Sequence, residues 1–123
     1  MQVSYTRIYA DEDGESHFED LDVALEPQDF APPAAPAHIG GFLSASGTFW
    51  FGADPSWDGQ AHPTPQRQIF CVVQGGVEGI TSDGEVRRFG PGGVVVLEDT
   101  EGKGHSTRVV GEEDLIMLGV AID

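Results

Sequence analysis

Apolar and polar residues alternate along several short stretches of the chain, and no stretch repeats its apolar residues with helical spacing. An alternation with a period of two predicts half-buried β-strands. It is clear over residues 1–10 and over 17–25, where Leu21, Val23 and Leu25 share one face and acidic residues occupy the other. The acidic residues predict that 17–25 is an edge strand with a charged outer face, because charge discourages pairing with further strands.

Glycine-rich turns divide the second half of the chain into further apolar segments. Asp83-Gly84 is a strong hairpin signal, because glycine tolerates the backbone angles that a tight turn needs. The predicted strands of this half are 68–74, 77–81, 86–89, 94–97, 105–110 and 115–120. An aromatic strand at 47–52, a loop at 54–59 and a proline-stiffened turn at 61–67 precede them. Short strands separated by frequent turns predict an all-β fold of the sandwich or barrel type.

A proline-rich segment separates the first strands from the rest of the chain. With little glycine or serine around them, its prolines predict a stiff, extended crossing segment rather than a flexible linker. These prolines are Pro27, Pro32, Pro33 and Pro36. Both flanks look like strands, and a length of 123 residues suits one domain. We expect a single domain over 1–123, with N-terminal strands and a Pro-rich arm over 1–46 and the core barrel over 47–121.

The net charge of −15 narrows the classes of partner. A chain with 21 acidic and six basic residues repels phosphate backbones and anionic membrane surfaces. Neither nucleic acid nor a membrane is therefore an expected partner, whereas a small molecule is. The charge either keeps the protein soluble by self-repulsion or steers a cationic ligand, and the sequence leaves both interpretations open.

The cysteine content and the N-terminal segment indicate the cellular compartment of the protein. Cys71 is the one cysteine, so neither a disulfide framework nor a cysteine-rich zinc site is available. No apolar run approaches the roughly 18 residues of a membrane span. Residues 1–7 lack the apolar region of a secretory signal. The expected compartment is the cytoplasm.

Two histidine segments border apolar strands. His62 lies among prolines just before the strand 68–74, and His105 opens the strand 105–110 after a glycine-rich turn. Alternate residues of a strand share a face, and prolines favour an extended backbone in the turn. We therefore expect these two segments to face each other. The residues predicted to point inward are His62, Thr64, Gln68, Phe70, Val72, His105, Thr107 and Val109.

The spacing of the first segment resembles the first sequence motif of the cupins, a family of small jelly-roll β-barrels. In the pattern G-x5-H-x-H-x3-E-x6-G, the first His falls on His62 and the closing Gly on Gly75. The second His position holds Thr64, the Glu position holds Gln68, and the opening Gly would fall on Ser56.

The second cupin motif, G-x5-P-x-G-x2-H-x3-N, is matched more loosely. Gly93 opens it, its G-x2-H part falls on Gly102–His105, and Val109 stands at the Asn position. The strings Arg87–Gly92 and Glu98–His105 are similar to those of small, uncharacterised single-domain cupins of bacteria.

The resemblance covers roughly residues 47–121 and implies a jelly-roll barrel with a metal site, typically of three His and one carboxylate. By the same analogy the extra N-terminal strands imply a homodimer. The candidate metal ligands are His62, Gln68 and His105, with Thr64 at a degenerate ligand position. They would hold one divalent transition ion (Fe, Mn, Ni, Cu or Zn). Alternatively, both histidines are hydrogen-bonded pocket residues in a metal-free site.

Other chemistry-bearing residues surround this pair. Glu98 and Asp99 are the candidate catalytic residues, as acid/base groups, unless they belong to a solvated turn. His17, on the acidic edge strand, is interpreted as structural. An apolar ligand pocket is expected in the barrel, lined by Phe49, Phe51, Trp57, Phe70, Val72 and Thr107.

Two functions remain open at this point. The first is a metal-dependent enzyme, of oxygenase or isomerase/lyase type, acting on a small organic molecule in the barrel. The second is a non-catalytic barrel in which the same histidines bind a small molecule by hydrogen bonds. Histidine at both outer ligand positions favours the first function, whereas Thr64 and Gln68 favour the second.

Overall fold

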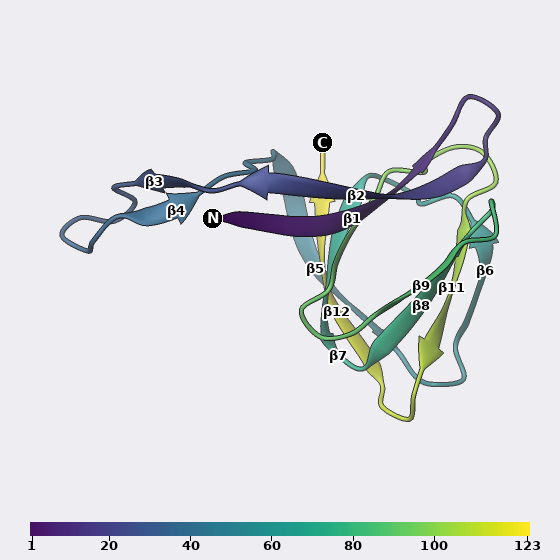
Figure 1. Ribbon diagram of the computed structural model, residues 1–123. Helices are drawn as coiled ribbons and strands as arrows, with labels where there is room; N and C mark the ends of the chain where they lie inside the picture. The colour runs from purple at the N-terminus through teal and green to yellow at the C-terminus, as the bar shows by residue number, and fades with distance from the viewer.

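The computed structural model of the chain describes residues 1–123 and is built from strands alone. Figure 1 shows two facing layers of strands and one hairpin that reaches away from them. The predicted all-β class is therefore confirmed. The strands are β1 (Gln2–Ala10), β2 (Ser16–Ala24), β3 (Glu26–Gln28), β4 (Ala37–Ile39), β5 (Ala45–Ala53), β6 (Asp58–His62), β7 (Gln68–Gln74), β8 (Gly76–Thr81), β9 (Val86–Phe89), β10 (Val94–Leu97), β11 (His105–Val110) and β12 (Leu115–Ile122).

The larger layer is a six-stranded sheet in the order β2-β1-β10-β7-β12-β5. β1 runs parallel to β10, pairing Thr6 with Val95 and Ile8 with Leu97, and the other neighbours are antiparallel. β2 lies at the edge of this sheet, as the sequence predicts.

The two faces of β2 differ from the expectation. Phe18, which shares a face with Asp20, is buried in the core, whereas Val23 and Leu25 line a hollow on the outside of the sheet. Asp20 and Asp22 are exposed although they share a face with the buried Phe18, whereas Glu19, on the other face, is half-buried and paired with Arg7.

The smaller layer is a four-stranded sheet in the order β6-β11-β8-β9. The sequence predicts a loop and a turn around residues 58–62, but the structure places β6 there, paired with β11. Asp58–His62 contains no β-branched or aromatic residue, so its own propensity does not favour a strand. Pairing with β11 supplies what the local sequence lacks. The two layers form an open double-sheet jelly roll, because no ladder joins one sheet to the other.

The proline-rich segment also differs from the expectation. β3 and β4 pair antiparallel, with Glu26 opposite Ile39 and Gln28 opposite Ala37. The segment therefore turns back on itself as a hairpin, which we call the arm (residues 26–39), and does not cross the molecule. In Figure 1 the arm extends away from both sheets.

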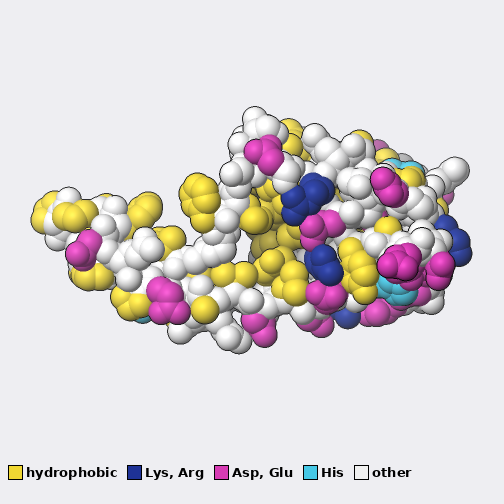
Figure 2. All heavy atoms as spheres, turned by 90° about the horizontal axis from the view of Figure 1, so that it is seen from above, with side chains coloured by type: hydrophobic (Ala, Val, Ile, Leu, Met, Phe, Trp, Pro, Cys, Tyr) yellow, Lys and Arg dark blue, Asp and Glu magenta, His cyan; other side chains and the backbone are white.

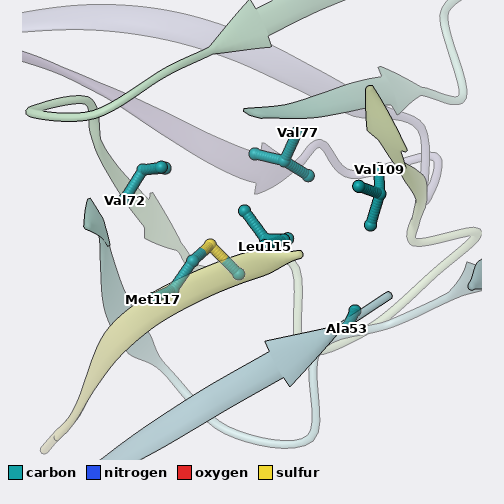
Figure 3. Packing of buried hydrophobic residues seen from close by; sticks show 6 residues of the cluster. All are labelled: Ala53, Val72, Val77, Val109, Leu115 and Met117. Carbon is teal, nitrogen blue, oxygen red and sulfur yellow. The ribbon is translucent and has the colours of Figure 1, made fainter. Parts of the chain in front are cut away.

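Two groups of buried apolar residues form the core. The first contains Ala53, Val72, Val77, Val109, Leu115 and Met117, which point from both sheets into the space between them (Figure 3). The second contains Ile8, Phe18, Val95 and Leu97. Phe70 and Phe89 pack against both groups. Only 25 of the 123 residues are buried, and part of the interior is a cavity rather than packed side chains.

In a structure without helices, no segment can cross a bilayer as a helix. The cytoplasmic location expected from the sequence stays a prediction.

Candidate functional site

A cavity of about 430 Å³ lies between the two sheets. It is lined by 20 residues, of which 12 are hydrophobic. No Lys, Arg, Asp or Glu side chain is among them. Sites for small molecules commonly span roughly 300–1,000 Å³ and have mainly apolar walls. The size and lining of this cavity are therefore those of a small-molecule site.

Aromatic rings form one part of the wall. The rings of Phe51 and Trp57 meet edge-to-face with their centroids 5.5 Å apart, and Phe70 lies 5.7 Å from both Phe49 and Phe51. Val72 and Thr107 line the cavity with them, so the structure places all six expected pocket residues in the wall.

Trp57 reaches the cavity because of a glycine. It precedes β6, and its indole ring occupies the space where a side chain at Gly59 would be. Gly59 is paired with Thr107 of β11, so the indole lies beside Thr107. The ring is thus part of the cavity wall, as expected for Trp57.

The two expected histidines meet at the wall. His62 ends β6, His105 opens β11, and the two residues are cross-strand partners. Their ring centroids are 5.9 Å apart and the rings are tilted by 34°. Gly104, at φ +70°, makes this approach possible, because a Cβ at that position would overlap the backbone of His62 and Pro63.

Both imidazoles use Nδ1 for hydrogen bonds within the protein. Nδ1 of His62 lies 2.6 Å from the carbonyl oxygen of Gln60, and Nδ1 of His105 lies 2.6 Å from Oδ2 of Asp99. A carbonyl oxygen and a carboxylate only accept, so both Nδ1 atoms carry the hydrogen. In the neutral rings each Nε2 is therefore left with a free lone pair. Because both side chains line the cavity, these lone pairs are its strongest hydrogen-bond acceptors.

Asp99 lies behind His105 rather than in the wall. Its side chain is fully buried, and His105, itself 4% exposed, is its one hydrogen-bond partner. The second carboxylate oxygen, Oδ1, is buried without a partner. The backbone carbonyl of Asp99 accepts from the amide of Thr64 at 3.0 Å, which ties this turn to the segment after His62. Asp99 thus acts on the cavity through His105.

Glu98, the other candidate catalytic residue, lies apart from the cavity. Its carboxylate accepts hydrogen bonds from Arg67 at 2.8 Å and from Arg7 at 3.5 Å. It is not among the lining residues. The structure therefore brings only one of the two candidate acid/base residues to the histidines.

Thr64 and Gln68 form a short buried chain of hydrogen bonds. Nε2 of Gln68 donates to Oγ1 of Thr64 at 2.9 Å, and that hydroxyl donates to the carbonyl oxygen of Gln66 at 3.0 Å. This chain fixes the orientation of the Gln68 amide and leaves its carbonyl oxygen as a further acceptor. Thr64 has its hydroxyl committed to the backbone.

These residues fit a transition metal ion only in part. His62 and His105 supply two imidazole nitrogens whose other nitrogen is held by an oxygen, as is usual for metal-bound histidine. Gln68 adds a neutral amide oxygen. No group of three or more His, Cys, Asp or Glu side chains is placed to share an ion. The donor set is thus suited to a weakly held ion.

Some wall residues were not identified from the sequence. Ile8, Val77, Gly79, Phe89, Val95, Leu97, Leu115 and Met117 complete the apolar lining. Each belongs to an apolar or alternating stretch, but which strand faces the cavity follows from the sheet order. The link between Asp99 and His105 was also missed, because it depends on how the turn between them folds.

Comparison with known proteins bears on the fold. No family model and no curated protein matches the sequence. Among solved structures, the cupin domain of Cnp3 from Schizosaccharomyces pombe is similar over 99% of this chain and 84% of that chain, with a TM-score of 0.51. The chain has the cupin fold. The jelly-roll class and the resemblance to the cupins, both expected from the sequence, are confirmed for the fold. At 13% identity the likeness to that cupin domain extends to the fold alone.

A second solved structure is less similar. A putative ethanolamine utilization protein Q from Salmonella typhimurium is 15% identical, with 99% of this chain and 97% of that chain covered and a TM-score of 0.40.

Proposed function

We propose that this cupin-fold chain binds a small organic molecule in the cavity between its sheets. The observation that carries the proposal is the wall itself, which is largely apolar but presents two imidazoles and a buried amide. Burial of an apolar ligand body supplies affinity, and a few convergent polar groups fix its orientation. His62, His105 and Gln68 are those groups.

The two tryptophans of the chain allow a direct test. Trp57 lies in the wall, whereas Trp50 is 68% exposed on the other face of its sheet. The Trp50→Phe variant therefore reports on the cavity through Trp57 alone, and Trp57→Phe reports on the outer surface. We expect neutral aromatic probes such as 2-phenylethanol and naphthalene to change the fluorescence of Trp50→Phe saturably and to leave Trp57→Phe unchanged. Equal responses of the two variants, or none, would overturn the proposal.

The metal-dependent enzyme is the second candidate, and the locked Nδ1 atoms of His62 and His105 are the observation that favours it. These two residues and Gln68 would hold the ion, which when bound would polarise an oxygen of the substrate. His105 would also be suited to moving a proton at Nε2, with Asp99 fixing its tautomer. Elemental analysis of protein purified without a His-tag tests this candidate. Stoichiometric metal that is lost in His62→Ala supports it, and no metal before or after adding Fe, Mn, Ni, Cu or Zn rejects it.

We also propose that two copies of the chain pair through the outside of the larger sheet. A hollow of about 250 Å³ lies there, lined by 11 residues without a charged side chain among them. The lining residues are Val3, Tyr5, Val23, Leu25, Gly40, Gly41, Phe42, Leu43, Ile69, Val94 and Val96. Figure 2 shows hydrophobic side chains along the arm and in the hollow beside it. An uncharged surface lets two acidic chains approach without burying like charges.

The exposed aromatic area supplies a large part of the surface that a second copy would cover. Phe30, Phe42 and Trp50 are 70%, 92% and 68% exposed. Since aromatic side chains each carry about 150–250 Å², covering these three removes roughly 500 Å² per copy from water. A standard interface buries about 800 Å² per partner, so the three rings supply more than half of it.

Light scattering after size exclusion measures this pairing. We expect a dimer for the wild type and a monomer for Phe42→Asp. Val86→Asp is the matched control, because Val86 is exposed on β9 of the smaller sheet. A monomeric wild type, or equal effects of the two substitutions, would contradict the pairing.

A further inference from the structure

We infer that the ligand of the cavity is an organic amine, bound as an ammonium ion with an apolar body. The inference rests on the proposed small-molecule function and specifies the chemical class of the ligand. Four features of the molecule carry it: the absence of free cationic groups, the acceptors in the wall, the aromatic rings and the charge of the whole chain.

The first feature is that the protein offers an anionic ligand no counter-ion. None of the six basic residues lines the cavity. Each is already paired with a carboxylate, in the pairs Arg7–Glu19, Arg67–Glu98, Arg87–Asp20, Arg88–Glu78, Arg108–Glu78 and Lys103–Glu15. An anion transferred into an apolar cavity without a partner loses its hydration uncompensated. Carboxylates and phosphates are thus disfavoured as ligands.

The second feature is that the polar groups of the wall mainly accept. In their neutral rings, Nε2 of His62 and Nε2 of His105 each present a lone pair, and Gln68 adds its carbonyl oxygen. A ligand that satisfies them must donate, and an ammonium group carries up to three N–H donors and no acceptor. Behind His105 lies the Asp99 carboxylate, which has one buried oxygen without a partner. A positive charge at the imidazole pair therefore faces a negative charge across one ring.

The third feature is the aromatic wall. Trp57 lies beside Thr107, which is two residues from His105 on β11 and shares its face. Phe51 and Phe70 continue the aromatic surface from Trp57. Cations are attracted to the faces of aromatic rings, most strongly to that of tryptophan. The apolar remainder of the cavity receives the body of the ligand.

The fourth feature is long-range. With a net charge of −15, the field of the protein concentrates cations near its surface and repels anions. The same field that disfavours nucleic acid thus favours an amine over an acid of the same shape.

Three probes of equal shape and different charge test the inference: 2-phenylethylamine, 2-phenylethanol and phenylacetate. We expect calorimetric titration at pH 7.5 to show the amine binding at least about tenfold more tightly than phenylacetate, with the alcohol in between. Added salt should weaken amine binding and leave the alcohol unchanged.

Matched variants locate the effect. Asp99→Asn and Glu101→Gln each remove one negative charge from the same turn, but Glu101 is exposed and has no part in the site. We expect Asp99→Asn to weaken amine binding about tenfold more than it weakens alcohol binding, because a bond to a charged group contributes more than a neutral one. Glu101→Gln should change neither. Even if Asp99→Asn fails to fold, the relative affinities of the wild type for the three probes test the inference.

The outcomes separate this inference from the proposed function. Phenylacetate or the alcohol binding as tightly as the amine, with a signal from Trp57, overturns the amine assignment and leaves the small-molecule function standing. Absence of binding for all three probes counts against both. Amine binding that Glu101→Gln weakens as much as Asp99→Asn places the ion on the surface and overturns the inference.

Discussion

Two histidines of this molecule contact aspartates, and they differ in whether a ring nitrogen remains free to bind a ligand. His105 uses Nδ1 for the buried Asp99 and keeps Nε2 at the cavity. His17 uses both nitrogens, with Nε2 at 2.7 Å from Asp11 and Nδ1 at 2.9 Å from Asp83. It joins the turn after β1 to the turn between β8 and β9. The histidine with both nitrogens committed is structural, and the one with a nitrogen free at a cavity can bind a ligand.

The largest difference between the two should appear in stability. His105→Leu leaves Asp99 buried without its one partner, and breaking a buried pair in this way costs about 3–5 kcal/mol. Denaturant unfolding monitored by circular dichroism measures this loss. His17→Leu, at the surface, should lose much less.

A double variant tests whether the unpaired Asp99 carboxylate causes that loss of stability. His105→Leu combined with Asp99→Leu removes the isolated charge, so part of the stability should return. A double variant that is less stable than the sum of the two single effects would contradict the idea that the unpaired carboxylate is the cause.

The next largest effect is expected at Gly104, which brings the two cavity histidines together. Gly104→Ala places a Cβ against the backbone of His62 and forces alanine into a positive φ. Gly111→Ala has the same problem of φ, at +88°, but meets nothing nearby. We expect Gly111→Ala to cost about 1 kcal/mol and Gly104→Ala about 1–3 kcal/mol more, with loss of probe binding only in the latter. Equal effects in unfolding and titration would show that the close approach is unimportant.

The smallest effect is the pH dependence of the His17 contacts. The hydrogen bonds to Asp11 and Asp83 raise the pKa of His17 above its ordinary value of 6.5. A raised pKa means that the stabilisation is complete below pH 6.5 and is lost as pH rises through the folded-state value. The melting temperature of His17→Gln should therefore fall below that of the wild type most at pH 5.5 and least at pH 8.5. A difference that is constant across this range would refute the assignment.

Much of the fold was predictable from the sequence because its signals are local. The alternation in β1, the apolar runs of β7 and β12, and the Asp83-Gly84 turn each specify their own structure. The hairpin of β8 and β9 forms at that turn, with Gly84 at φ +92°. Two cupin motifs then gave the jelly-roll class, which the structure bears out.

The rest depended on pairing between distant segments. β6 exists because β11 lies beside it, which the polar sequence of β6 does not reveal. The arm folds back because β3 meets β4, although its prolines alone suggest an extended segment.

The roles of site residues were equally hidden. Glu98 and Asp99 are neighbours in sequence, yet one is held by two arginines and the other by His105. What separates them is the direction in which each side chain leaves the turn.

The parallel pairing of β1 with β10 links the cavity to the course of folding. Ile8 in β1 and Leu97 in β10 are partners in that ladder, and both belong to the wall. Contacts between segments so far apart in sequence form slowly, because a long loop must close first. The wall is complete only once β1 has docked, so a bound ligand stabilises the docked state. Amide hydrogen exchange in β1 should therefore slow when the cavity is filled, although most of this strand lies outside it.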